Sequence, residues 1–400
     1  MKGKIMNNYL FIIRTLTEMC RPIMKGTVLF RSFNGQYNDN PRYVSEKLHR
    51  MHPEANIVWA IGDGSKDSFP DYAKTVLIDS AEYAKYVARA EIVVDNYCGC
   101  RTNYLNVNNP VKRFVFWLLS RRRRGQLCIS TWHGTPLKHI ALDEPQYKGS
   151  KFAKGYFNTD VLIAGCKLTA DAYRTAFGWH GEVMMCGTPR NDMLVNGSSP
   201  DIKERLGLPK DKRVLLFAPT FRNSVEMSGI YQLKKINTEE LLGALARRFG
   251  GEWCFVFRSH NLVMSKIQSE SLSVNDKIIN GNSHPDMAEY LAAADALLTD
   301  YSSSMFDYAL TKRPVFLYTP DLDDYKNSER GFYFDIESTP FSVSRSFCEL
   351  VKNITEFDRS AYEGRVDEFL IKIGNAEKGS ATDAVVSRIE RHLEVQNEKN

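Results

Sequence analysis

Apolar runs and amphipathic stretches alternate along almost the whole chain. Six apolar runs in the first half are typical of strands: "GTVLFRSF", "NIVWAI", "KTVLIDS", "EIVVDN", "QLCIST" and "DVLIAG". A second series contains "RVLLFAPTF", "EWCFVFRSH", "KIING", "ALLTD" and "PVFLY". Helical stretches such as "PRYVSEKLHRMH", "SAEYAKYVARA" and "TEELLGALARRFG" separate them. This alternation predicts an α/β protein with parallel sheets.

A segment rich in glycine, serine, proline and charge, residues 196–212, separates the two series and is typical of a domain boundary. We therefore expect two doubly wound, Rossmann-like domains, residues 1–200 and 201–400, that face a central cleft. The last helix, in "ATDAVVSRIERHLEVQNEKN", is a candidate to pack back on the first domain. In open α/β sheets, ligands bind outside the carboxyl ends of the strands.

The composition fits a globular protein, with 43% hydrophobic residues, 25% charged residues and a mild net charge of +5. Most of the eight cysteines lie in apolar runs, which favours buried thiols in a reducing compartment. Cys98 and Cys100 form the only close pair, and no second pair follows at zinc-finger spacing. No DxD pair follows a strand, and no P-loop is present. We expect neither a metal nor a cofactor.

The first site motif is "QLCISTWHGTPLKHI", residues 126–140. A predicted strand runs directly into Trp132-His133-Gly134-Thr135-Pro136-Leu137, and a helix is expected to start after the proline. A turn of this kind exposes backbone N–H groups and suits an anion. A histidine beside it suits proton transfer near neutral pH.

Polar residues follow four more predicted strands. They are Thr188-Pro189-Arg190 after "EVMMCG", Ala218-Pro219-Thr220-Phe221-Arg222 after "RVLLF", Arg258-Ser259-His260 after "WCFVF", and Thr299-Asp300-Tyr301-Ser302-Ser303-Ser304 after "ALL". The three arginines of this set could hold a pyrophosphate, although each alone is more often a surface residue.

The three serines open a predicted helix and could hold a phosphate, while Asp307 could accept hydrogen bonds from a ribose. A simple serine cap with a solvated aspartate is the alternative. His133 and His260 are the two histidines that follow predicted strands in opposite domains. Of the other histidines, only His284 is kept as a less favoured candidate for the site.

Taken together, "STWHGTPLK", "CGTPRND", "APTFR", "RSH", "TDYSSSMFDYALTKRPVFLY" and "RGFYFD" resemble the CDP-glycerol glycerophosphotransferases of teichoic-acid and capsule synthesis. The order and spacing match over roughly residues 25–390, and "SFNGQYNDNPRYV" resembles the family's first loop. The resemblance implies a GT-B-type fold. It also implies transfer of glycerol phosphate from CDP-glycerol to a hydroxyl of a lipid-linked saccharide or poly(alditol phosphate) acceptor, with release of CMP.

The resemblance also implies roles for single residues. His133 and His260 would be the catalytic pair. Substrate-binding residues would be Gly134, Thr135, Pro136, Leu137, Arg190, Thr220, Arg222, Arg258, Thr299, Ser302, Ser303 and Asp307. A neutral imidazole suits removal of a proton from the acceptor alcohol, so we expect His133 to be the general base and His260 to stabilise developing charge. The reverse assignment stays open.

A lipid-linked acceptor implies contact with the membrane. Residues 111–124, "VKRFVFWLLSRRRR", place six cations around an aromatic and aliphatic segment, which suits an anionic bilayer surface. A core helix followed by a solvated basic loop is the alternative. No run of about eighteen apolar residues is present, so we expect a peripheral protein at the cytoplasmic face of the membrane. No nucleic-acid motif accompanies the patch.

Three other functions remain open at this stage. A CDP-ribitol phosphotransferase would use the same residues, and a nucleotide-sugar glycosyltransferase or epimerase would share the architecture. A non-catalytic membrane-binding module is the third, and the presence of both histidines, the serines and Asp307 argues against it.

Overall fold

A computed structural model of the chain describes residues 13–62, 69–97, 123–147, 159–220, 233, 235–258, 278–323, 325 and 331–397. The chain divides into two compact units. Unit 1 contains Met1–His133, Ala141–Asp192 and Ala376–Asn400. Unit 2 contains Gly134–Ile140 and Met193–Asn375. The main division falls between residues 192 and 193, and the last segment of the chain belongs to unit 1.

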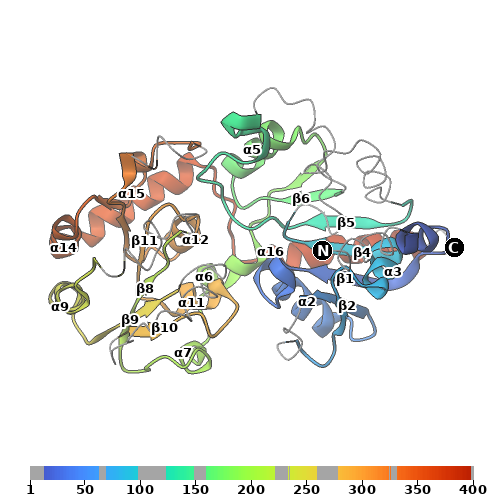
Figure 1. Cartoon of the computed structure of the whole chain (residues 1–400), viewed down its shortest axis with the longest axis horizontal. Helices are drawn as coiled ribbons and strands as arrows, with labels where there is room; N and C mark the ends of the chain where they lie inside the picture. Colours follow the sequence, from blue (N-terminus) through green and yellow to red (C-terminus); the bar gives the residue numbers. More distant parts are fainter. Residues whose placement is uncertain are drawn as a thin grey trace, which may run out of the picture. The chain divides into compact units, whose positions relative to one another are not determined.

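Unit 1 contains a parallel sheet of seven strands in the order β3-β2-β1-β4-β5-β6-β7 (Figure 1). The strands are β1 (Met24–Arg31), β2 (Asn56–Ile61), β3 (Lys74–Leu77), β4 (Ala90–Asp95), β5 (Leu127–Ser130), β6 (Val161–Ile163) and β7 (Glu182–Met184). The helices are α2 (Asp39–Met51), α3 (Ala81–Arg89), α5 (Lys167–Phe177) and α16 (Ala381–Asn397). The reversal of strand order at β1 and β4 is the doubly wound arrangement.

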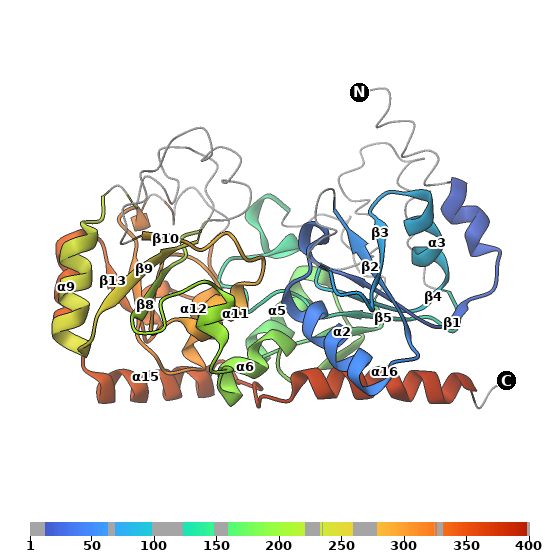
Figure 2. The same ribbon diagram turned by 90° about the horizontal axis from the view of Figure 1, so that it is seen from below.

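Both faces of the central strands of this sheet are buried, which explains why these strands are continuous apolar runs. On one face, Val28 and Phe30 of β1 pack with α2 and with Val386 of α16. On the other face, Leu29 packs with Val87 of α3. Figure 2 shows α16, in red, running alongside α2 on the same face of the sheet. The end of the chain is therefore part of the core of unit 1.

Unit 2 contains a parallel sheet of six strands in the order β10-β9-β8-β11-β12-β13. The strands are β8 (Arg213–Phe217), β9 (Trp253–Phe257), β10 (Ile278–Asn280), β11 (Ala296–Thr299), β12 (Val315–Tyr318) and β13 (Ser342–Ser344). The helices are α7 (Ile202–Arg205), α9 (Thr238–Phe249), α11 (Met287–Ala293), α12 (Ser304–Ala309), α14 (Phe347–Thr355) and α15 (Arg359–Lys372), and α6 (Asp192–Asn196) leads in from unit 1. This order is again doubly wound, so the predicted fold class is confirmed for both sheets.

The helix expected after Pro136 is absent from the structure, and that prediction was wrong. Residues 134–140 instead form an irregular segment of unit 2 that pairs with residues 331–333 through an isolated antiparallel bridge between Lys138 and Phe332. The His139 N–H donates to the Gly331 carbonyl at 3.0 Å, and the Tyr333 N–H donates to the Leu137 carbonyl at 2.9 Å. Leu137 is buried, so long-range pairing and burial override the local helical pattern.

Candidate functional site

His133 lies directly after β5, at the carboxyl edge of the first sheet, and is the last residue of unit 1 before the chain enters unit 2. The preceding Trp132 has a φ of 52°, in the left-handed region that a bulky residue rarely adopts. Its ring is buried and packs edge-on against Phe177, with the ring centroids 5.3 Å apart. This packing holds the backbone in its conformation. Strained backbone of this kind is typical of functional sites.

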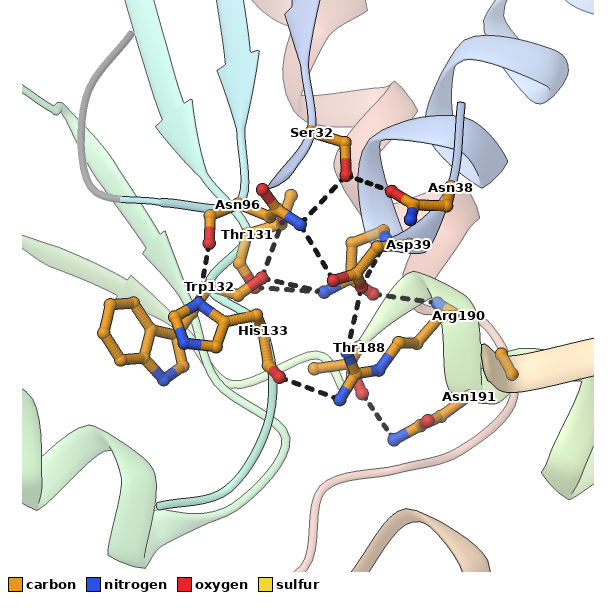
Figure 3. Close-up of polar contacts among 12 residues, drawn as sticks. Ser32, Asn38, Asp39, Asn96, Thr131, Trp132, His133, Thr188, Arg190 and Asn191 are labelled. Atoms are coloured by element: carbon orange, nitrogen blue, oxygen red, sulfur yellow. Dashed lines mark hydrogen bonds and ion pairs between the residues drawn. The ribbon is translucent and has the colours of Figure 1, made fainter. Parts of the chain in front are cut away.

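The imidazole of His133 is oriented by a backbone carbonyl. Nδ1 lies 2.9 Å from the oxygen of Asn96, the residue after β4 (Figure 3). A carbonyl oxygen only accepts hydrogen bonds, so Nδ1 carries the proton. In the neutral ring, Nε2 then has the lone pair. The ring is also bordered by Phe33 and Tyr97, with ring centroids 5.7 and 6.1 Å away.

A charged pair beside His133 comes from two other elements. Asp39, the first residue of α2, accepts a hydrogen bond from Arg190 Nη1 at 3.0 Å, and both side chains are mostly buried. Arg190 Nη2 donates to the His133 carbonyl at 2.9 Å. The Asn96 amide donates to Asp39 Oδ2 at 2.8 Å. Figure 3 shows how this network connects the ends of β4 and β5 to α2.

Asn40 completes the network through the backbone. Its amide donates to the carbonyls of Thr131 and Trp132 at 3.3 and 3.0 Å, and its oxygen accepts from the Arg190 N–H at 2.9 Å. Asp39 itself has a φ of 58°, a conformation that aspartate tolerates better than most residues. The residues around His133 are therefore held by backbone as well as side-chain contacts.

The surroundings of His133 favour its neutral form. Burial lowers the pKa of the imidazole from its ordinary value. The hydrogen bond with the Asn96 carbonyl and the negative charge of Asp39 oppose this change, while the positive charge of Arg190 adds to it. A lowered pKa leaves the ring unprotonated at pH 7, with Nε2 available as a base.

The rest of the "CGTPRND" motif anchors the end of the chain. Glu377 accepts hydrogen bonds from the Thr188 N–H at 2.9 Å, from the Thr188 hydroxyl, and from the Asn191 amide at 3.0 Å. Gly187 has a φ of 89°, and a Cβ there would lie 2.6 Å from Glu377 Oε2. Glycine is therefore required for the carboxylate to approach this closely.

In unit 2, Asp300 joins the ends of two neighbouring strands. Its Oδ1 accepts from the Thr220 N–H at 2.8 Å, from the Thr220 hydroxyl at 2.6 Å and from the Tyr301 N–H at 2.6 Å. Thr220 follows β8 and Asp300 follows β11, and these strands are adjacent in the sheet. The carboxylate is fully buried, so it fixes the loop that carries Thr220.

The serine segment lies at the same edge of the second sheet. Ser302 and Ser303 are partly exposed, and the hydroxyls of Ser302 and Ser304 lie 2.9 Å apart. The N–H groups of Met305 and Phe306 donate to the Ser302 and Ser303 carbonyls. Asp307 is 5% exposed, which contradicts the alternative of a solvated aspartate.

Besides Arg190, two residues predicted to bind substrate have their polar groups committed elsewhere. The guanidinium of Arg258 donates to the carbonyls of Gly281, His284 and Pro285 at 2.5–2.9 Å and lies over the Tyr290 ring. It therefore stabilises the loop after β10. Thr299 is fully buried, and its hydroxyl donates to the Ala218 carbonyl at 2.7 Å. This placement corrects the expected substrate contact of Thr299.

The other predicted residues fall into two groups. Gly134, Thr135, Pro136 and Leu137 belong to the irregular segment of unit 2, where Lys138 Nζ lies 5.1 Å from the centre of the Tyr325 ring. His260 and Arg222 lie outside the described residues, as do Cys98, Cys100 and residues 111–122. Among the residues that the structure describes, no cluster of histidine, cysteine and carboxylate side chains could hold a metal ion.

Sequence reasoning missed Asp39, Asn96 and Asp300 as organisers of these sites. Asp300 and Asn96 directly follow a strand, which is a signal that could have identified them. Asp39 lies in "SFNGQYNDNPRYV", the segment that resembles the family's first loop, but its pairing with Arg190 joins residues 151 positions apart. No local pattern reports a contact over that separation.

Comparisons with known proteins agree with this fold. A model of the CDP-glycerol:poly(glycerophosphate) glycerophosphotransferase family matches residues 13–391. A teichoic acid poly(glycerol phosphate) polymerase of Staphylococcus epidermidis is 29% identical over 95% of this chain and 53% of its own length. One of the same name from Bacillus spizizenii is 29% identical over 97% of this chain and 100% of its own length.

The chain thus spans about half the length of some curated relatives and the full length of another. Among solved structures, that of the wall teichoic acid polymerase TagF superimposes with a TM-score of 0.79 at 28% identity, covering 99% of this chain and 96% of that one. A histidine-to-asparagine variant of TagF, solved after soaking with CDPG, superimposes with a TM-score of 0.78.

Proposed function

The chain belongs to the CDP-glycerol:poly(glycerophosphate) glycerophosphotransferase family, and on that premise we propose that it transfers glycerol phosphate from CDP-glycerol to a hydroxyl of a teichoic-acid or capsule acceptor. The acceptor oxygen forms a bond to the phosphorus that carries glycerol, and the bond from that phosphorus to the CMP oxygen breaks. The acceptor proton passes to the enzyme, and CMP leaves. The relatives reported above, named for glycerol phosphate, support glycerol over ribitol.

The observation that carries this proposal is the orientation of His133. With Nδ1–H bonded to the Asn96 carbonyl, Nε2 is the free base in a ring whose pKa is lowered by burial. A neutral imidazole can take the proton of the acceptor hydroxyl as the oxygen attacks. Asp39 and Arg190 act as positioning residues: Asp39 holds the side chain of Asn96, whose carbonyl orients the ring, and Arg190 holds the His133 carbonyl.

We assign the CDP-alditol to unit 2. Ser302, Ser303 and Thr220 are partly exposed at the carboxyl edge of the second sheet, where ligands of doubly wound folds bind. Asp307 is the candidate partner of the ribose, and Gly134, Thr135, Pro136 and Leu137 lie in the same unit. His260 remains the proposed partner of the donor pyrophosphate by resemblance to the family. Phosphoryl transfer depends mainly on such positioning and charge stabilisation.

The proposed acceptor is lipid-linked, and the first unit would face it from the cytoplasmic side of the membrane. No helix in the described part of the chain is long and apolar enough to cross a bilayer. We propose that the protein contacts the membrane surface peripherally, through the basic segment at residues 111–124. Arg123 is not a suitable membrane cation, because its guanidinium donates to the Ala88 and Arg21 carbonyls at 3.2 and 2.6 Å.

The activity is tested by measuring nucleotide release from separate donors. The protein is incubated with CDP-glycerol, CDP-ribitol or UDP-N-acetylglucosamine, each with and without a lipid-linked acceptor. We expect acceptor-dependent CMP release from CDP-glycerol and a product that is heavier by one or more glycerol phosphate units. CMP from CDP-ribitol alone would indicate the ribitol enzyme, and UDP release would indicate a glycosyltransferase. No release from any donor would contradict the proposal.

A further inference from the structure

A cavity of about 430 Å³ lies at the amino end of β5, the end opposite to His133. Its lining includes Arg123, Arg124 and Gly125 from the segment that enters the strand, Asp160, and Arg388 and His392 from α16. All these residues belong to unit 1. We call this site the basic cavity. A four-residue strand covers about 13 Å, so the basic cavity is separate from the surroundings of His133.

The walls of the basic cavity are held by contacts across the sheet edge. His392 Nε2 lies 3.2 Å from the Gly125 carbonyl, which joins the last turns of α16 to the segment before β5. Arg123 is fixed by the carbonyls of Ala88 and Arg21. Asp160 accepts a hydrogen bond from the Cys128 N–H at 2.8 Å. The cavity is therefore built by elements far apart in the sequence.

The charge of the lining is strongly unbalanced. The lining contains three arginines, Arg123, Arg124 and Arg388, and a single acidic residue, Asp160. Among the described residues, none accepts a hydrogen bond from the Arg124 side chain. Arg388 has one weak acidic partner, Glu182, at 3.4 Å, and the Glu182 side chain is 48% exposed. This arrangement leaves positive charge to attract an anion into the cavity.

The kind of anion follows from the chemistry of the lining. Guanidinium groups match the paired oxygens of a phosphate, and the lining contains no phenylalanine, tyrosine or tryptophan to stack on a nucleobase. The volume lies in the range of small-ligand sites and exceeds what a single phosphate needs. We infer that the basic cavity binds a phosphate diester and, resting on the proposed function, one with glycerol on both sides. The headgroup of an anionic phospholipid and a poly(glycerol phosphate) chain both present this group.

Glycerophosphoglycerol is a soluble probe of this chemistry, and calorimetry measures its binding to the full chain. Arg388→Gln should weaken binding about tenfold, because it removes one charge-assisted contact. Arg124→Gln should weaken it as well. Arg391→Gln is the matched control, since Arg391 lies on an exposed part of the same helix and outside the cavity lining. It should bind like the parent.

Glu182→Gln distinguishes the loss of the cavity arginine from the loss of its ion pair with Glu182. This change breaks the same contact as Arg388→Gln but leaves the arginine in place, so binding should be equal or tighter. Thermal unfolding of each variant checks that the fold is retained. Absence of binding by the parent would refute the inference, as would equal losses in Glu182→Gln and Arg388→Gln, or unchanged binding in both Arg388→Gln and Arg124→Gln.

Two further measurements identify the source of the phosphate diester. Co-sedimentation with phosphatidylglycerol vesicles should fall in Arg388→Gln if a lipid headgroup occupies the cavity. Affinity for soluble poly(glycerol phosphate) should fall instead if the polymer occupies it. Either loss supports the inference, and unchanged values in both measurements would refute it. CMP release with a short soluble acceptor should stay at the parent level, because none of these residues lies near His133.

Discussion

Replacing Asp39 with asparagine should impair both the stability of unit 1 and the action of His133. The change removes the charge that pairs with Arg190 at 3.0 Å and weakens the contact from the Asn96 amide at 2.8 Å. Asparagine still tolerates the left-handed backbone at this position, so the effect is not one of backbone strain.

The size of the effect follows from these contacts. Hydrogen bonds to charged groups contribute about 1.5–3 kcal/mol each. The carboxylate accepts three here, from Arg190, from the Asn96 amide and from the Asn40 N–H, and asparagine keeps only one of the two accepting oxygens. Both members of the ion pair are mostly buried, which leaves Arg190 without its counter-charge. We expect the free energy of unfolding to fall by about 2–3 kcal/mol. Turnover should fall about 10- to 100-fold, because the imidazole loses support for its position.

The pH dependence of activity distinguishes a positioning role from a purely structural one. The negative charge of Asp39 raises the pKa of His133 and the positive charge of Arg190 lowers it. In Asp39→Asn, the acid limb of kcat/KM should therefore move to lower pH. In Arg190→Gln, it should move to higher pH. The base is the neutral ring, so activity is lost in both variants as the pH falls through the pKa.

The assay is CMP release from CDP-glycerol between pH 4.5 and 8, with stability measured by urea denaturation at pH 7.5. Asp71→Asn, an exposed carboxylate in the same unit, is the matched control and should behave like the parent. Acid limbs that move in the same direction in the two variants, or that do not move, would refute the electrostatic reasoning. Unchanged stability in Asp39→Asn would refute the assignment of the ion pair.

Two further predictions concern other parts of the molecule. Asp307→Ala should weaken binding of CDP in calorimetry by about tenfold, as expected for loss of a ribose contact; equal affinity would remove Asp307 from the donor site. Glu377→Gln should lower the free energy of unfolding by about 1–3 kcal/mol, because one of its oxygens no longer accepts from Thr188 or Asn191. The exposed Glu394→Gln is its control, and equal stability of the two variants would contradict the anchoring role.

The sequence predicts the fold well because its strands are distinctive. "NIVWAI" coincides with β2. "ALLTD" and "PVFLY" contain β11 and β12, and each run is one residue longer than its strand. These strands are buried on both faces, so their apolar runs are continuous. The short strand β13, Ser342–Ser344, escaped notice because it is polar and half-exposed, and only pairing with β12 defines it.

At the candidate site, the contacts that the sequence does not predict join residues that are distant in the sequence. "PLKHI" has a helical pattern, yet it pairs with residues 331–333. Arg190 and Arg258 have the right chemistry for a pyrophosphate, yet their guanidinium groups are engaged by Asp39 and by three carbonyls. A polar residue directly after a strand indicates the edge of the sheet at which a functional site lies. The groups to which its side chain bonds depend on the tertiary structure.

The most direct test of the central claim is the turnover of His133→Ala with CDP-glycerol and a lipid-linked acceptor. The claim is that Nε2 of His133 takes the proton of the acceptor hydroxyl, and loss of a general base lowers turnover by about 10²- to 10⁴-fold. Affinity for the donor, measured by calorimetry with CDP-glycerol, should stay close to that of the parent, because the CDP-alditol is assigned to unit 2. CMP release at the parent rate by His133→Ala would contradict the account.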